Sequence, residues 1–580
     1  MDQKRLFLAI AISLAILFGF RLILPSRPTP HPAAQPTQST PAAQTPLAPT
    51  GNPAAPGTEP MAVAPPREVP RLQVEAPRVE GSISLVGARF DDLVLRDYHE
   101  EVSKQSPLVR LLEPRSDPQP YYAQFGWAAD DKAVAVPGDD TLWTASDGPL
   151  TATHPVTLSW DNGSGLTFQL VVRVDANYMF TVEQRVQNAG SAPVSLHPWA
   201  RIRRDYTPVT AGYYILHEGL VGVLDGTLHD VTYAKAKSEG KDRGGVAYDE
   251  TSPGGWAGIT DKYWLTALIP DQAAPETASY RHIVQDGSDR YQVDFLAHDA
   301  QAVQPGAAAA STTHLFAGAK EVHLLDRYEA SLGIPSFWKA VDFGWFFFLT
   351  RPIFYALDWL YGIVGNFGVA ILVFTLFVKA LFFPLANKSY GSMSKMKLLG
   401  PKIQEMRERF KDDPARQQQE MMALYKIEKV NPASGCLPML LQVPVFFSLY
   451  KVIFTTIEMR HAPFFGWIHD LSVVDPTNIF TLFGAIPWDP TRISPLLHLG
   501  IWPLIMGLTM FAQQKVNPPP PDPVQARLFQ FMPVVFTFMM GRFPAGLVIY
   551  WSWNNTLTVL QQWFIMRRTR VAQRATPVRT

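Results

Sequence analysis

The chain has 580 residues with 51 basic and 51 acidic side chains, so it is long enough for several domains and its net charge identifies no class of partner. It contains a single cysteine, Cys436, which excludes an intrachain disulfide framework and a thiolate metal site within one chain. Because Cys436 lies in an apolar stretch, we expect it to be a small core residue.

The N-terminal residues resemble a signal sequence. Lys4 and Arg5 precede an apolar run over 6–20, but no small-residue cleavage site follows directly. We therefore predict an uncleaved transmembrane anchor over 1–24 with its N-terminus inside the cell. Residues 25–80 are rich in Pro, Ala and Thr and contain little that could be buried, which predicts a disordered or polyproline linker.

Residues 81–332 are predicted to form a β-sandwich domain. Apolar and polar side chains alternate over 156–160 and again over 166–172, and the intervening DNGSG supplies the residues of a tight turn. Further short segments, punctuated by Gly, Asn and Pro, continue this pattern. We expect three tryptophans of this region to lie in the core, with a sugar-binding cleft as the alternative: Trp160, Trp256 and Trp264.

Aromatic residues are dense between 333 and 362, where a few charged residues interrupt them. Because Trp favours the boundary between lipid and water, this pattern predicts an amphipathic helix lying in the outer membrane interface. The helix leads into a predicted transmembrane helix over 363–386.

One lysine lies inside that apolar span. Lys379 and, one helical turn earlier, Thr375 share a face of the stretch 367–385, which is long enough to cross a bilayer core. A charge at this depth is costly unless it meets water, a partner or a functional need. Two interpretations stay open: the ammonium group reaches the inner headgroups along its own stem, or it faces a hydrated groove.

Residues 387–432 are polar, strongly helical and rich in Lys and Arg. Asp413 is predicted to be an N-cap with Pro414 at the first helical position, so two helices form a hairpin outside the membrane. The positive-inside rule places this hairpin in the cytoplasm. Methionine adapts to varied apolar partners, so four side chains are predicted to contact client proteins: Met396, Met406, Met421 and Met422.

The rest of the chain alternates between apolar spans and connections. We predict transmembrane helix 3 over 433–456, a periplasmic loop over 457–494, transmembrane helix 4 over 495–514, a cytoplasmic loop over 515–526, transmembrane helices 5 and 6 over 527–566, and a basic cytoplasmic tail over 567–580. Six spans then place both termini and the hairpin in the cytoplasm of a bacterium, and the β domain in its periplasm.

No catalytic or cofactor-binding motif is present. The sequence lacks the glycine-rich phosphate loop, the nucleophile elbow GxSxG and the zinc helix HExxH. The spacing of His461 and His469 fits no common metal site. We therefore expect neither an enzyme nor a bound metal or cofactor. Acidic residues are nearly missing from the spans after residue 360, which argues against a cation-coupled transporter.

Uncharged polar side chains and the cation of Lys379 remain in the middle of the spans. Six residues are predicted to line a hydrophilic groove: Lys379, Thr375, Gln442, Trp551, Asn555 and Thr558. Ordinary interhelical hydrogen bonding is the alternative explanation for the uncharged members. A hydrated groove shortens the dry path of a polar segment through the bilayer, and a cation in it attracts acidic residues of that segment.

One long stretch and two shorter ones resemble the YidC-type membrane protein insertases of the YidC/Oxa/Alb family. They are residues 395–450, beginning KMKLLGPKIQEMRERF, residues 462–476, APFFGWIHDLSVVDP, and residues 531–551, FMPVVFTFMMGRFPAGLVIYW. The resemblance implies a five-helix insertase core, a periplasmic all-β domain similar to a supersandwich, and a positively charged groove. It also implies an insertase and folding chaperone that works alone or beside the Sec translocase on nascent membrane proteins, with membrane lipids and the ribosome, through the hairpin and basic tail, as further partners.

The chain departs from the family pattern in three places. Lys379 stands where the family usually has arginine, which keeps the charge but loses the planar guanidinium group. Trp551 stands where the family often has tyrosine, and the loop over 479–494 looks longer than in the family. Two other classes stay open: a membrane-anchored periplasmic carbohydrate-binding protein and a polar-solute transporter, although no convincing internal repeat supports the latter.

Overall fold

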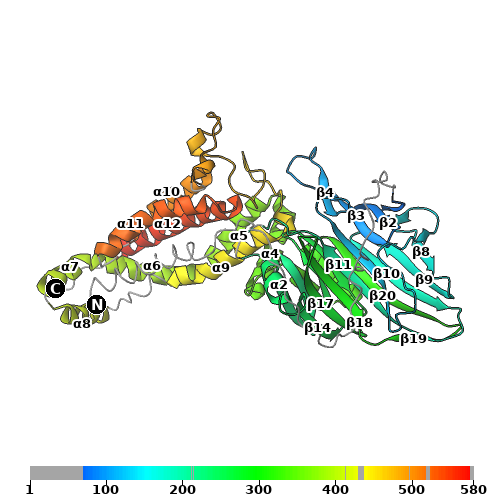
Figure 1. The fold of residues 1–580 in the computed structure, drawn as a ribbon. Coiled ribbons are helices and arrows are strands. Elements are labelled where there is room, and N and C mark those ends of the chain that lie inside the picture. The colour runs from blue at the N-terminus through cyan, green and yellow to red at the C-terminus, as the bar shows by residue number, and fades with distance from the viewer. Residues whose placement is uncertain are drawn as a thin grey trace. The chain divides into compact units, whose positions relative to one another are not determined.

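The computed structural model describes residues 69–574 except 211, 213–214, 412, 429–436, 495–496 and 518–522. The predicted anchor over 1–24, most of the predicted linker, Cys436 and the last six residues of the basic tail lie outside the described residues. The described chain consists of a β domain followed by a series of helices (Figure 1).

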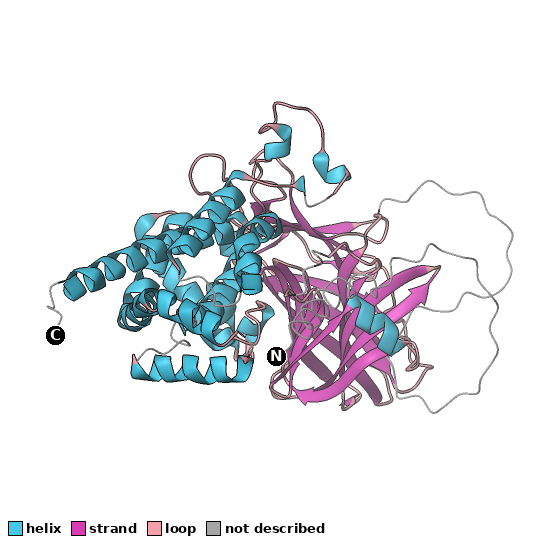
Figure 2. Cartoon of the chain, turned by 90° about the vertical axis from the view of Figure 1, so that its left-hand side faces the viewer, coloured by secondary structure: helices cyan, strands magenta, loops and turns pink. Residues whose placement is uncertain are grey.

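Two sheets form the β domain (Figure 2). The larger sheet contains β1 (Arg71–Glu75), β2 (Val79–Ser84), β3 (Arg89–His99), β4 (Leu108–Leu112), β5 (Tyr121–Ala129), β7 (Leu150–Thr151), β11 (Val194–Arg204), β14 (Val246–Pro253), β17 (Pro275–Gln285), β18 (Ser288–Ala297) and β19 (Gln301–Val303). The smaller sheet contains β6 (Thr144–Ala145), β8 (Val156–Asp161), β9 (Leu166–Val174), β10 (Met179–Asn188), β12 (Gly219–Leu224), β13 (Thr227–Thr232), β15 (Trp256–Thr260), β16 (Trp264–Ile269) and β20 (Ala308–Ala319).

The two sheets pack face to face around a shared aromatic core. Phe90 of the larger sheet meets Phe180 of the smaller sheet at 5.6 Å between ring centroids, and Trp127 meets Phe168 at 5.0 Å. Such pairs add to the free energy gained by burying the rings. Trp256 is fully buried, whereas Trp160 and Trp264 are half-buried. The predicted β structure of this region is therefore confirmed.

The hairpin of β8 and β9 follows from its turn residues. Gly163 and Gly165 have φ angles of +72° and +92°, which glycine adopts without steric cost. The Asn162 Oδ1 atom accepts hydrogen bonds from the backbone N–H groups of Ser164 at 2.8 Å and Leu166 at 3.0 Å. The turn thus sets the strand register.

The described β domain differs from the prediction in where it begins and in its helix content. Strand β1 lies inside the predicted linker. The sequence pattern does not predict this strand, because only two buried residues, Leu72 and Val74, carry its alternation. The domain also contains two helices, α2 (Tyr233–Gly240) and α3 (Val322–Leu332), so it is not all-β. Gly333, with a φ of +66°, ends α3 in the left-handed conformation.

Nine helices follow in the described part of the chain: α4 (Phe347–Val364), α5 (Phe367–Leu381), α6 (Phe383–Leu398), α7 (Gly400–Arg409), α8 (Pro414–Ile427), α9 (Leu437–Thr455), α10 (Ile501–Val516), α11 (Pro523–Met540) and α12 (Ala545–Arg574). Within the described ranges, no single helix has both the length and the hydropathy needed to cross a bilayer. Helices α4 and α5 meet that requirement only as a pair, and the pair is bent by 119°. The six-span topology stays a prediction.

Helix α4 is amphipathic, as the aromatic pattern predicts, but it begins later than residue 333. Only a short 3-10 helix, η1 (Phe337–Ala340), precedes it, and Gly344 has a φ of +71° that interrupts helical geometry. Phe354 is fully buried, whereas Trp359 is 64% exposed. One face of α4 therefore packs on the protein, and the other presents aromatic side chains outward.

Polar contacts join the β domain to the segment after α9. The Arg460 Nη2 atom donates to the backbone oxygen of His99 at 2.6 Å, and the Tyr263 hydroxyl donates to Ser472 Oγ at 3.1 Å. Glu458 lies at the same junction, where its Oε1 atom accepts a hydrogen bond from Val322 N at 2.9 Å. Its Oε2 atom is buried and has no hydrogen-bond partner among the described residues. Burial raises the pKa of this carboxyl from 4.5 to about 7.

We expect Glu458→Gln to raise the thermal stability of the purified chain at pH 8 and to change it little at pH 5. Because the pKa of Glu458 is higher in the folded than in the unfolded state, folding binds a proton between pH 4.5 and about 7. The stability of the wild-type chain therefore falls as the pH rises through this window, by up to about 1.4 kcal/mol per pH unit. Unfolding midpoints in detergent at both pH values measure this. An equal effect of the substitution at pH 5 and pH 8 would contradict the raised pKa of Glu458.

Candidate functional site

Helix α5 carries the cation at the centre of the site. The Asn366 side chain caps the helix by accepting a hydrogen bond from Val369 N at 3.0 Å. Lys379 lies in the last turn, where the free carbonyl groups of the helix end favour a positive charge. One turn earlier on the same face, the Thr375 hydroxyl donates to the backbone oxygen of Ile371 at 2.7 Å.

Helix α12 supplies the partner of this cation. The Lys379 Nζ atom donates a hydrogen bond to Thr558 Oγ1 at 2.8 Å, and the Thr558 hydroxyl donates in turn to the backbone oxygen of Asn554 at 2.7 Å. The indole N–H of Trp553 donates to the backbone oxygen of Leu372 at 3.1 Å, which ties the two helices together. The ammonium group is therefore held between α5 and α12.

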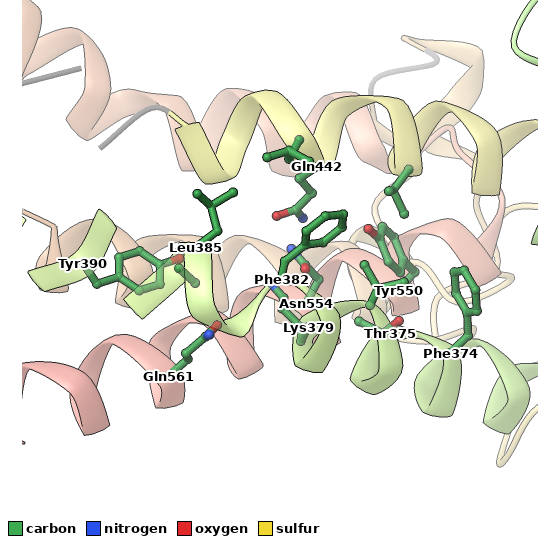
Figure 3. Close-up of a pocket in the computed structure, with 14 residues that line it drawn as sticks. Phe374, Thr375, Lys379, Phe382, Leu385, Tyr390, Gln442, Tyr550, Asn554 and Gln561 are labelled. Atoms are coloured by element: carbon green, nitrogen blue, oxygen red, sulfur yellow. The ribbon is translucent and has the colours of Figure 1, made fainter. Parts of the chain in front are cut away.

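A cavity opens beside Lys379, between α5, α6, α9 and α12 (Figure 3). About 50 Å³ of it is accessible to a water-sized sphere, which is enough for several water molecules. Figure 3 shows the amide of Gln442 on α9 pointing toward Asn554 of α12. The lining residues are Phe374, Thr375, Val378, Lys379, Phe382, Leu385, Ala386, Tyr390, Leu441, Gln442, Val445, Tyr550, Asn554 and Gln561.

The cavity is lined by one positively charged side chain and otherwise by neutral groups. Lys379 alone is charged among the lining residues, and the others are apolar side chains, hydroxyls and amides. Within the described part of the chain, no carboxylate lies within ion-pair distance of Lys379. A hydroxyl stabilises an ammonium group but does not neutralise it, so the charge stays available to an anionic group that enters the cavity.

The structure brings together four of the six predicted groove residues. Thr375, Lys379 and Gln442 line the cavity, and Thr558 binds Lys379. The other two face away from it. Trp551 packs against Phe446 of α9 and Phe536 of α11, with ring centroids 4.7 and 5.7 Å apart.

Asn555 also points elsewhere, because its Nδ2 atom donates to Thr509 Oγ1 of α10 at 3.4 Å. The lining residues that the sequence pattern missed on α12 are Tyr550, Asn554 and Gln561. Their spacings of four and seven residues match one helical face, which is the signal that could have identified them.

The methionines of the hairpin lie apart from the cavity lining. Met422 of α8 is 49% exposed, while Met396, Met406 and Met421 are half-buried. Helices α7 and α8 are held together by the Gln417 side chain, whose Nε2 atom donates to the backbone oxygen of Arg407 at 3.2 Å. Client contact through these methionines stays a prediction. In the described ranges no group of three or more His, Cys, Asp or Glu residues could hold a metal ion.

Known protein families and individual known proteins match most of the chain. Residues 71–356 match the family described as YidC periplasmic domain, and residues 359–573 match the family described as 60Kd inner membrane protein. A protein of Granulibacter bethesdensis named Membrane protein insertase YidC is 65% identical over 573 residues, which cover 98% of this chain and 99% of the relative. Proteins with the same name from Acidiphilium cryptum and Methylorubrum extorquens are 58% and 50% identical, covering 87% and 98% of this chain and 86% and 96% of the relatives.

These matches define an inner-membrane protein with a β-rich periplasmic domain and a helical C-terminal region. The chain belongs to the YidC family of membrane protein insertases, and it is not an enzyme in the catalytic sense. The resemblance seen in the sequence is thereby confirmed. The comparisons do not favour a carbohydrate-binding protein or a polar-solute transporter.

Proposed function

We propose that the cavity beside Lys379 is the site at which polar segments of client membrane proteins enter the bilayer. The single observation that carries this proposal is the cation itself: it is half-buried beside a cavity between four helices, and its hydrogen-bond partner is the neutral hydroxyl of Thr558. A partly buried charge without a counter-ion is destabilising, so its presence calls for a function. An acidic residue of a client is a suitable transient counter-ion.

The polar lining lowers the cost of moving a client segment. Each unpaired backbone or side-chain polar group that enters hydrocarbon costs several kcal/mol, of the order of 2–7. The amides of Gln442, Asn554 and Gln561, together with water in the cavity, offer replacement hydrogen bonds partway across. The segment then faces a shorter apolar path.

The proposed topology has six spans. Residues 1–24 form the first, and the segments around α5, α9, α10, α11 and α12 form the other five. The density of Lys and Arg in 387–432 and 567–580 supports a cytoplasmic hairpin, cytoplasmic termini and a cavity on the cytoplasmic side. The proposed partners are nascent membrane proteins, the Sec translocase, membrane lipids and the ribosome, the last through the basic tail and hairpin.

Cysteine accessibility tests whether the cavity is hydrated. In a protein whose Cys436 is replaced by Ser, single substitutions Thr375→Cys, Lys379→Cys and Thr558→Cys are expected to react with a water-soluble maleimide added from the cytoplasmic side. The reason is that thiols react as thiolates, which form only where water reaches them.

Two positions on the same helix provide the matched controls. Leu376 and Phe377 of α5 are 46% and 60% exposed but lie outside the cavity lining, so they are expected to face lipid. Cysteines at these positions should stay unmodified in membranes and become reactive in denaturant. Equal reactivity at all five positions, or no reaction at positions 375, 379 and 558, would remove the support for a hydrated groove.

A further inference from the structure

The connection between α9 and α10 contains a structured segment with an apolar tip. We call residues 477–494 the outer loop segment; it includes the 3-10 helices η4 (Ile479–Thr481) and η5 (Pro490–Arg492). Its base is fixed to the start of α10, because Asn478 Nδ2 donates to the backbone oxygen of Leu497 at 3.0 Å and Ile479 N donates to that of Leu499 at 3.0 Å. In both views it extends as a loop from the N-terminal end of α10 (Figures 1 and 2).

The backbone at the tip of the segment is strained at two apolar residues. Leu482 and Phe483 have φ angles of +46° and +60°, a left-handed conformation that disfavours every residue with a Cβ atom. Backbone hydrogen bonds to Ile479 O at 3.0 Å and Asn478 O at 3.1 Å hold them there. Yet their side chains are 59% and 61% exposed, so packing within the described chain does not offset the strain.

Further apolar side chains surround the tip. Ile486, Trp488 and Ile493 are 42%, 43% and 74% exposed. The indole N–H of Trp488 already donates to the backbone oxygen of Phe480 at 2.8 Å, so the exposed part of the ring is apolar. The segment contains one acidic and one basic side chain, Asp489 and Arg492, which lie 3.7 Å apart at its edge.

We propose that the tip of the outer loop segment inserts into the outer leaflet of the membrane and anchors the start of α10 to the lipid surface. Helix α10, which follows the segment, also exposes apolar side chains: Leu508 and Phe511 are 70% and 44% exposed. A cluster of Leu, Phe, Ile and Trp without net charge matches the boundary between headgroups and acyl chains. The inference rests on the proposed membrane crossing of α10, but not on the cavity.

Fluorescence quenching in vesicles tests the anchor. The full chain, with Cys436→Ser and one introduced cysteine, is labelled with an environment-sensitive dye and reconstituted into phosphatidylcholine and phosphatidylglycerol vesicles. A dye at Phe483→Cys should be quenched by doxyl-labelled lipid, and iodide quenching should be about fivefold or more weaker than at a water-exposed site, because the side chain leaves water. Leu508→Cys is the lipid-exposed control, and Val284→Cys, at a residue 62% exposed in the β domain, is the aqueous control.

The controls separate the possible failures. A dye at Phe483 that behaves like the one at Val284, while the dye at Leu508 is quenched by lipid, overturns the anchor and leaves the span intact. If the dyes at both Phe483 and Leu508 behave as in water, the proposed membrane crossing of α10 is overturned as well. Shielding of Phe483 in native membranes but not in pure lipid vesicles overturns the lipid assignment in favour of a protein partner. Adding Leu482→Asp at the exposed tip should return the Phe483 dye to water without altering the dye at Leu508.

Discussion

Removing residues 399–428, which contain α7 and α8, is expected to abolish membrane insertion while leaving the cavity in place. Helix α6 is kept, because its Tyr390 lines the cavity and packs in one cluster with Ile565 of α12. The hairpin presents Met422 and Ile427 at 49% and 76% exposure, a flexible apolar surface that suits clients of varied sequence. Protease protection of a small client, measured in cells depleted of the native insertase, reports the loss. Normal insertion at normal protein levels would reduce the hairpin to a topology signal.

Matched substitutions in the hairpin distinguish the contribution of its apolar surface to insertion from the contribution of its charges. Lys402→Gln should have little effect, because its ion pair with Glu428, at 3.0 Å, is exposed, and such pairs contribute about 0–1 kcal/mol. Replacing Met421 and Met422 together by Leu should preserve insertion, whereas replacing both by Ser should impair it.

Removing the much larger region 71–319 should leave insertion active, since no residue of the β domain lines the cavity.

Local signals in the sequence predicted local structure well. The turn between β8 and β9 was predictable because Gly163 and Gly165 reach backbone conformations closed to other residues. The start of α8 was predictable because Asp413 caps it, accepting a hydrogen bond from Arg416 N at 3.0 Å, and Pro414 occupies its first turn. Each of these features is decided by a few neighbouring residues, so the rest of the chain need not be known.

The lining of the cavity was only partly predictable, because α12 carries polar residues in adjacent pairs. Asn554 faces the cavity while Asn555 donates to Thr509 of α10. Likewise Gln561 faces the cavity while the Nε2 atom of Gln562 donates to Asn517 Oδ1 at 3.0 Å. Periodicity identifies a polar stripe on α12, but only the packing of α10 against it decides which member of each pair turns inward.

Reversing the charge at Lys379 is expected to have the strongest effect of any single substitution. A carboxylate at this position can accept a hydrogen bond from Thr558 if that hydroxyl turns away from the Asn554 backbone oxygen, so Lys379→Glu need not disturb the fold. It would, however, repel acidic residues of a client. At an effective dielectric constant near 20, two charges about 4 Å apart interact by roughly 4 kcal/mol, so attraction becomes repulsion of similar size. Lys379→Arg keeps the charge and should preserve activity.

Two client versions make the test specific. One carries an acidic translocated tail, and in the other each Asp and Glu of the tail is replaced by Asn or Gln. Lys379→Glu and the neutral control Lys379→Met, which is similar in length, should impair insertion of the acidic client more than that of the neutral one. If the ammonium group only reaches toward the inner headgroups, Lys379→Met should be harmless or stabilising, because a costly charge is removed from the apolar span. Equal insertion of both clients by both variants would therefore establish that interpretation and exclude a role for the charge in client binding.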